Sequence, residues 1–206
     1  MLKTIFIELL SKYSSNTNLH RTLWNEIEKQ YSSTKRHYHS LSHLENLLIE
    51  LNEIKSNIKD WDTTLFSLYY HDIIYDAKSS KNEEKSAELA IKRLKDIGYP
   101  PLKIEHCFNQ IIATKSHEVN EDSDTNLFTD ADLSILGSCW ETYTTYISQI
   151  RKEYSIYPDF IYKPGRQKVL HHFLDMQRIF KTDYFYFKFE QQARQNIRKE
   201  LKLLSS

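Results

Sequence analysis

The sequence predicts an all-α fold, a single-domain helical bundle of about eight to ten helices. Three observations support this prediction. Only three glycines and four prolines occur among 206 residues, which leaves little material for β-turns. Apolar residues recur at helical spacing along most of the chain. With 40% hydrophobic and 13% aromatic residues, the chain can bury a sizeable core.

The first helices are predicted by apolar stripes. Residues 2–13 and 17–31 each place apolar side chains on one face, and from Leu41 onwards leucine recurs at positions 44, 48 and 51. Residues 62–75 are apolar nearly all round. A helix with no polar face belongs in the interior, so we expect this segment to be the central buried helix.

The next helix is marked at both ends. Ser80 and Glu83 have the spacing of a capping box, and Asn82 is an alternative cap. Gly98, followed by two prolines at 100 and 101, predicts where the helix stops. The sequence therefore predicts a polar loop and then a capped helix that ends just before Gly98.

The second half of the chain shows the same helical stripes, separated by short polar segments such as "HEVNEDSDTN". No internal repeat, low-complexity tract or long linker is visible, so we expect a single domain over residues 1–206. The further helices are expected near 101–116, 127–137, 140–157, 165–177 and 184–203.

Composition excludes several classes of function. Lys+Arg and Asp+Glu are both 28, and a net charge of +0 predicts no general attraction to nucleic acid or membrane. Cys107 and Cys139 lie far apart and are too few for a zinc finger, so we expect two reduced, buried thiols in a cytoplasmic protein. Glu8 interrupts the first apolar stretch, which argues against a signal peptide.

A His-Asp pair stands in the most apolar segment, "YYHDIIYD". Burying His71 and Asp72 is unfavourable unless a partner compensates for their desolvation. Neighbouring helical residues point about 100° apart, so both side chains can reach one ion beside the helix. Imidazole and carboxylate are ordinary ligands of divalent metals. Taken alone, the pair has a simpler explanation, in which His71 bonds a backbone carbonyl and Asp72 pairs with an arginine.

Two other apolar segments offer metal-type ligands. "RHYHSLSHLENLL" contains His37, His39 and His43, of which His43 is the best placed to face inward because it borders the apolar stripe. "NLFTDADLSILG" contains Asp130 and Asp132. Asp130 could equally be a helix N-cap. It is the ordered set of His, His-Asp and Asp that favours a metal site over separate structural roles.

This order resembles the HD superfamily of metal-dependent phosphohydrolases, and more closely a bacterial group of small stand-alone predicted HD phosphohydrolases. The resemblance implies an HD-type helical fold and one divalent ion (Mn, Fe, Co, Ni, Zn or Mg) held by His43, His71, Asp72 and Asp132. The "AD" pair favours Asp132 over Asp130, which would instead orient a ligand histidine. The matching stretches, within about 36–154, are "RHYHSLSHL", "YYHDIIYD", "NEEKSAELA", "IIATKSH", "FTDADLSILG" and "IRKEY", with a weaker echo in "FEQQARQNIRKEL".

Further residues are candidates by the same resemblance. Asp72 would share a proton with a water molecule, and Glu83 would activate that water, although a carboxylate at a helix start is also stabilised by the helix dipole. His117 is a candidate for a second metal or for phosphate. Arg36 and Lys115 are candidates for contacts with the substrate phosphate, because both are cations near the motifs.

We therefore expect a hydrolase that cleaves a phosphate ester, such as a nucleotide or another small phosphorylated metabolite. A rival of a different class is a non-catalytic helical module that binds a nucleotide or a protein and carries a structural metal. A dinuclear HD oxygenase ranks lower, because only His106 and His117 supply the additional histidines it needs. Neither nucleic acid nor a membrane is expected as a partner, and no motif defines the substrate or an oligomeric state.

Overall fold

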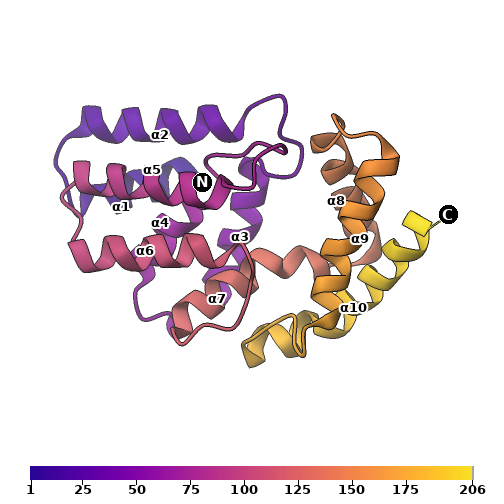
Figure 1. Cartoon of the computed structure of the whole chain (residues 1–206). Helices are drawn as coiled ribbons and strands as arrows, with labels where there is room; N and C mark the ends of the chain where they lie inside the picture. Colours follow the sequence, from indigo (N-terminus) through magenta and orange to yellow (C-terminus); the bar gives the residue numbers. More distant parts are fainter. Residues whose placement is uncertain (206) are drawn as a thin grey trace. The chain divides into compact units, whose positions relative to one another are not determined.

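The computed structural model describes residues 1–205, and in this range the chain forms ten α-helices and no strand (Figure 1). The prediction of an all-α fold with eight to ten helices is confirmed. The helices are α1 (Leu2–Ser11), α2 (Thr17–Tyr31), α3 (Leu41–Glu53), α4 (Trp61–Tyr70), α5 (Asn82–Asp96), α6 (Pro101–Ala113), α7 (Ser123–Asp132), α8 (Trp140–Glu153), α9 (Asp159–Asp175) and α10 (Asp183–Ser205), with 3-10 turns η1 (Lys55–Asn57) and η2 (Leu133–Gly137).

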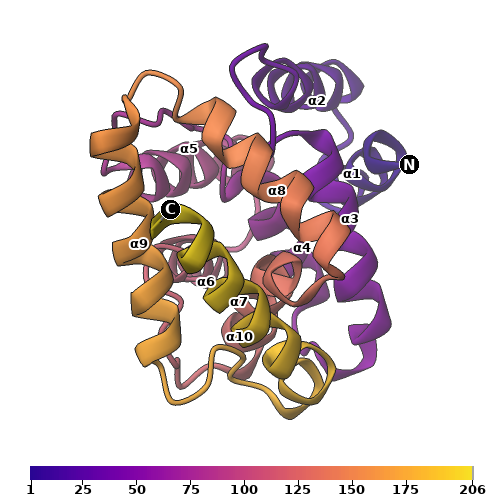
Figure 2. The ribbon, with the colours of Figure 1, turned by 90° about the vertical axis from the view of Figure 1, so that its right-hand side faces the viewer.

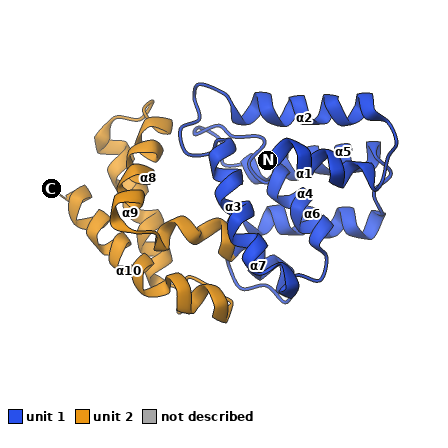
Figure 3. Cartoon of the chain, turned by 180° about the vertical axis from the view of Figure 1, so that it is seen from behind, with its two compact units in different colours: residues 1–129 blue, residues 130–206 orange. Residues whose placement is uncertain are grey.

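The chain divides into two compact units, unit 1 over residues 1–129 and unit 2 from residue 130 onwards (Figure 3). The division falls inside α7, which continues unbroken from Ser123 to Asp132. The single domain expected over residues 1–206 stays a prediction. No helix among the described residues is long and apolar enough to cross a membrane.

Helix α4 forms the centre of unit 1. Every residue from Thr63 to Tyr70 is buried, which confirms the central buried helix predicted from the sequence, although the helix ends at Tyr70 and not at residue 75. Helices α5 and α6 pack on one another and on α4, and α1 and α2 lie side by side (Figures 1 and 2). The rings of Phe6 on α1 and Tyr69 on α4 have centroids 4.6 Å apart, so α1 closes the core over α4.

The start of α5 differs from the prediction. Lys81 is the N-cap residue and makes no side-chain capping bond, so the predicted capping box between Ser80 and Glu83 is not formed. Instead, the Asn82 side chain accepts a hydrogen bond from the Asp76 amide at 3.1 Å and donates one to the Asp76 carbonyl at 3.0 Å. These two bonds close the loop between Asp76 and Asn82, and α5 begins at Asn82. The Ser80 hydroxyl therefore does not cap the helix.

The predicted end of α5 is confirmed. Gly98 adopts φ +73°, the left-handed conformation that glycine adopts without steric cost. The Tyr99 amide then bonds back to the Leu94 carbonyl at 2.9 Å, which satisfies a carbonyl that the helix end would leave unpaired.

Unit 2 is built around α10 and the turn η2. The Asn196 side chain of α10 donates hydrogen bonds to the carbonyls of Leu136 and Ser138, at 2.9 and 2.8 Å. Gly137 packs so closely on α10 that an added Cβ would lie 2.5 Å from the Phe189 Cβ. Only glycine therefore fits at this contact.

Both cysteines are free thiols. Cys107 is buried in α6, as expected, whereas Cys139 is exposed. The expectation of two buried thiols is wrong for Cys139 because this residue is the N-cap of α8, where the chain leaves the interior before the helix begins.

Candidate metal centre

His71 lies at the end of α4 with its orientation fixed. It is the C-cap residue, keeps a right-handed helical backbone and is only 1% exposed. Its Nδ1 lies 2.9 Å from the Leu68 carbonyl oxygen. Because a carbonyl oxygen can only accept, Nδ1 carries the proton and donates it. The other ring nitrogen, Nε2, faces the His43 ring and the Asp72 carboxylate, and in a metal-binding histidine it is this second nitrogen that would bind the ion.

His43 brings a second imidazole to the same place from the first turn of α3. Its side chain is buried, and its Nε2 lies 3.0 Å from the His71 Nε2. Two nitrogen ligands bound at right angles, each 2.0–2.1 Å from an ion, would be about 2.9 Å apart. The spacing of the two nitrogens therefore fits shared coordination of one ion.

The Asp72 carboxylate faces three imidazoles. Its Oδ2 lies 3.1 Å from the Nε2 of His71, 3.7 Å from that of His43 and 3.9 Å from that of His39. Burial by itself would raise the pKa of Asp72, but the neighbouring histidines, His71 first and then His39 and His43, lower it well below its usual range. Asp72 is consequently an ionised carboxylate directed at nitrogen ligands.

Asp132 is a further candidate ligand. Side-chain ligand atoms of His43, His71 and Asp132 all lie within 4.8 Å of one another, close enough to hold one metal ion. Asp132 is the last residue of α7, and the Phe128 ring on this helix packs edge-on against the His71 ring with centroids 5.8 Å apart. Phe128 and Asp132 are four residues apart, and residues at this spacing share a helix face.

Asp130 has a different environment, inside unit 2. One oxygen accepts from the Lys181 amide at 2.9 Å and lies 3.0 Å from the Lys181 Nζ. The other accepts from the amide and the hydroxyl of Thr182, both at 2.7 Å. The expectation that Asp130 orients a ligand histidine is not supported, because these bonds use both oxygens to anchor the segment that precedes α10.

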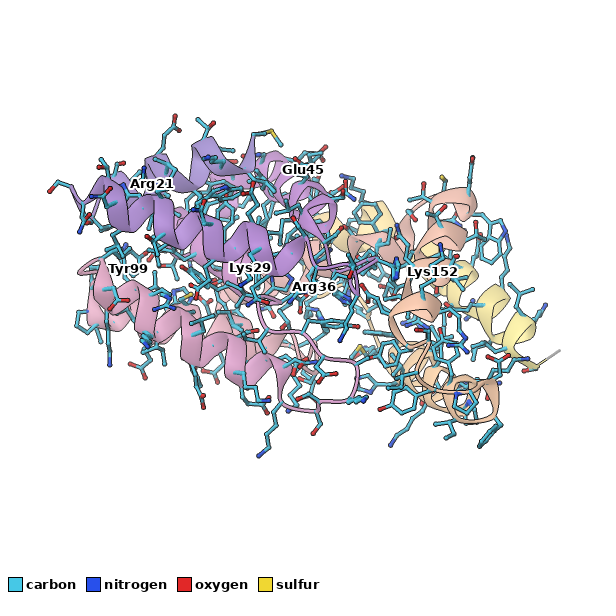
Figure 4. The ribbon with its side chains drawn as sticks, turned by 90° about the horizontal axis from the view of Figure 1, so that it is seen from above. Arg21, Lys29, Arg36, Glu45, Tyr99 and Lys152 are labelled. Carbon is cyan, nitrogen blue, oxygen red and sulfur yellow. The ribbon has the colours of Figure 1, made fainter. Side chains whose placement is uncertain are left out.

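Arg36 also departs from its expected role. Figure 4 shows it just beyond the C-terminal end of α2, and its side chain is buried. Its terminal nitrogens donate to the carbonyl oxygens of Asp72, Ile73 and His39, at 2.7, 2.8 and 3.3 Å. These bonds speak against the expected contact with a substrate phosphate, because three of the five N–H donors of the guanidinium already bind backbone carbonyls.

Glu83 lies at the start of α5, and Lys115 lies just beyond the end of α6. The Lys115 Nζ pairs with Glu84 and donates to the Ser80 carbonyl at 2.9 Å, which speaks against a free phosphate contact. Glu83 is half-buried in the first turn of α5. Burial raises the pKa of the Glu83 carboxyl, and the negative charge of Asp72 raises it further. Glu83 is therefore a carboxyl that can hold a proton more readily than an exposed one.

The two histidines that a dinuclear site would need lie on α6 and just beyond it. His106 bonds the Asp122 carboxylate at 2.8 Å, beside the start of α7. His117 follows the end of α6, half-buried, with a left-handed backbone at φ 54°. The structure thus gives His106 a partner of its own, and the second-metal role of His117 stays a prediction.

His39 is the residue near the site that sequence reasoning passed over. Its ring stacks on Tyr75 with centroids 4.2 Å apart, and its Nε2 faces Asp72. The segment "RHYHSLSHL" offered three histidines, but helical periodicity could rank only His43, because His39 precedes the helix. The "HYH" triplet was the only sign in the sequence that a histidine before the helix could face the site. It did not show whether His37 or His39 does so.

Comparisons of this chain with protein-family models, with curated proteins and with solved structures found no match. The chemistry must therefore be inferred from the residues themselves. Imidazole nitrogens with a fixed lone pair and an ionised carboxylate converge at the end of α4. Such a donor set suits a divalent transition metal.

Proposed function

We propose that this chain is a metal-dependent phosphohydrolase of the HD type, which cleaves the ester of a small phosphorylated molecule. One observation carries the proposal: the Nε2 atoms of His39, His43 and His71 surround one oxygen of the Asp72 carboxylate, at 3.9, 3.7 and 3.1 Å. The motif order that resembles the HD superfamily supports it, and Asp132 stands where that order requires a final aspartate.

The donor set fits a single divalent ion. His43, His71, Asp72 and Asp132 would hold it, two through nitrogen and two through oxygen, a mixture that zinc, iron, manganese, cobalt and nickel accept. The chemistry supplied by such an ion is polarisation of a phosphoryl oxygen and a lower pKa of water. Four protein ligands leave room for further ligands on a metal of six-fold coordination.

The protein's own groups then have separate tasks. The Leu68 carbonyl holds the His71 ring in the tautomer whose Nε2 can bind. The low pKa of Asp72 keeps it an anion across the neutral pH range. Glu83, whose pKa is raised by burial and by Asp72, is the group that we assign to taking a proton from water.

A substrate screen tests this function. The purified full-length chain is loaded with Mn, Fe, Co, Ni, Zn or Mg in turn, and phosphate release is measured from nucleotides, cyclic nucleotides and sugar phosphates. We expect activity that requires metal and is lost in Asp72→Asn. Asp62→Asn is the matched control, because the Asp62 carboxylate bonds Lys12 and Tyr13 in the same unit and should leave activity intact.

The opposite result is also informative. If the chain binds metal but releases phosphate from none of these compounds, the hydrolase proposal fails and the non-catalytic binding module is favoured. If activity appears but survives in Asp72→Asn, the hydrolysis takes place at another site.

A further inference from the structure

The guanidinium of Arg36 joins the two segments that carry the candidate ligands. One terminal nitrogen donates both to the His39 carbonyl, which lies before α3, and to the Asp72 carbonyl, which lies after α4. The other donates to the carbonyl of Ile73. A single buried cation thus connects the histidine segment "RHYHSLSH" to the His-Asp pair.

The Arg36 charge lies just beyond the C-terminal end of α4. The dipole of a helix favours a positive charge at this end. The Asp72 and Ile73 carbonyls lie just beyond the last residue of α4, Tyr70. Arg36 therefore satisfies backbone acceptors at the point where the Asp72 carboxylate leaves the chain.

Tyr31 binds the backbone of the same residue, Asp72, through its N–H group. Its hydroxyl accepts a hydrogen bond from the Asp72 amide at 3.2 Å and donates one to the Tyr69 carbonyl, also at 3.2 Å. The Arg36 guanidinium carbon lies 4.8 Å from the centre of the Tyr31 ring, so the two side chains also stack. Together they bind both the N–H and the C=O of Asp72.

We propose that Arg36 and Tyr31 form a brace, a pair of positioning residues that fixes the Asp72 carboxylate against the imidazoles of His43 and His71. The inference rests on the proposed metal centre and assigns these residues no contact with substrate. It requires arginine, because a planar fork of N–H groups reaches several carbonyls at once, whereas lysine offers a single point charge. The brace therefore acts through geometry as well as charge.

Cobalt binding to the full-length chain tests the brace. Co²⁺ is titrated into the wild type, Arg36→Lys, Arg36→Met and Tyr31→Phe, and the affinity and the visible absorption spectrum are recorded. Removing groups that orient metal ligands typically weakens affinity about 10–100-fold. We expect a loss of this size and an altered spectrum for both Arg36 variants, and a smaller loss for Tyr31→Phe.

Arg93→Lys is the matched control. Arg93 makes two hydrogen bonds to Glu26 in the same unit, at 2.7 and 2.6 Å, so its replacement removes a comparable fork of bonds away from the ligands. We expect its cobalt affinity and spectrum to match those of the wild type. A loss of affinity equal to that of Arg36→Lys would show a general effect of weakened packing and would overturn the brace.

The remaining outcomes are distinct. Wild-type cobalt binding with an unchanged Arg36→Lys overturns the brace and leaves the proposed function standing. A wild type that binds neither cobalt nor any other divalent metal overturns both. If circular dichroism shows that neither Arg36 variant folds, the test rests on Tyr31→Phe. An unchanged cobalt affinity and spectrum in that variant would overturn the brace.

Discussion

Each unit contains a buried cluster of charged and polar side chains, and the two clusters differ in how the charges are matched. In unit 2, the Glu200 carboxylate receives two bonds from Arg166, at 2.7 and 3.1 Å, and one from the Tyr143 hydroxyl at 2.5 Å. In unit 1, the carboxylate of Asp72 faces the imidazole nitrogens of His71, His43 and His39.

The difference indicates which cluster is structural. In the unit 2 cluster, Arg166 and Tyr143 donate to both oxygens of the Glu200 carboxylate, so protein groups alone compensate its charge. In the unit 1 cluster, the His71 Nε2 and the Asp72 carboxylate lie 3.1 Å apart, an arrangement that a divalent cation would complete. We expect the first cluster to contribute to stability without metal and the second to contribute through metal.

The largest effect is expected from Arg166→Met in unit 2. The substitution leaves the Glu200 charge, whose side chain is 1% exposed, without its ion-pair partner. Breaking a buried pair in this way costs about 3–5 kcal/mol of unfolding free energy. Denaturant unfolding measures the loss, which should be the same with and without metal. A loss below about 1 kcal/mol would mean that the unit 2 cluster is not a stabilising one.

Asp130→Ala and Asp132→Ala separate the two carboxylates of the "DAD" motif. Asp130→Ala removes a buried ion pair with Lys181 and should cost about 3 kcal/mol in the metal-free protein, with metal affinity nearly unchanged. Asp132→Ala should do the reverse and weaken metal binding more than Asp130→Ala. Unfolding in chelator and isothermal titration calorimetry measure the two effects. Equal losses of affinity would mean that both carboxylates bind the ion.

Asp72→Ala tests the unit 1 cluster by the same two measurements, stability in chelator and metal affinity. Metal at a hundred times its dissociation constant should stabilise the wild type by about 2.7 kcal/mol and the variant not at all. In chelator, the variant should be slightly less stable than the wild type, because the histidines that lower the pKa of Asp72 stabilise its charge in the folded state. If Asp72 were structural, the chelated variant would instead lose about 1–5 kcal/mol and keep its metal affinity.

Glu83 gives a pH test of the proposed hydrolysis. Its carboxylate can take a proton only above its raised pKa, so the rate should fall as the pH falls through that value. Glu83→Gln should lower the rate about 100-fold and abolish this acid limb. The charges that act on Glu83 are Asp72, Lys115 and Glu84. An acid limb retained in Glu83→Gln would assign the proton transfer to another group.

The smallest effect is expected from Lys115→Met. Lys115 lowers the pKa of Glu83, so removing this positive charge should move the acid limb of the rate towards higher pH. The pH–rate profiles of Lys115→Met and the wild type measure the displacement. A displacement in the opposite direction would show that Lys115 does not act through the Glu83 carboxyl.

The features that the sequence predicts correctly are those set by local periodicity. The stripe over 17–31 coincides with α2, and the apolar run around Tyr70 is the buried α4. Features that depend on distant partners were not predictable. The Asn82 side chain displaced the capping box because it closes a loop on Asp76, and the residues that bind Asp130 lie about fifty positions along the chain.

The candidate site shows the same limit. The resemblance to the HD superfamily implied one ligand set of His43, His71, Asp72 and Asp132, and His71 lies 3.0 Å from His43 and 3.1 Å from Asp72. The sequence could not predict that Arg36 binds backbone carbonyls. Every residue has a carbonyl, so such bonds do not depend on which side chains surround the arginine. His39 lies outside the periodic part of its segment, so no stripe could place it.

The most direct test of the metal centre is elemental analysis of the wild type beside His71→Ala, after each has been supplied with Mn, Fe, Co, Ni and Zn. We predict about one ion per wild-type chain, a higher melting temperature when it is bound, and neither in His71→Ala. A wild type that retains no ion and shows no thermal shift with any of these metals would contradict the claim that the histidines and aspartates at the end of α4 form a metal centre.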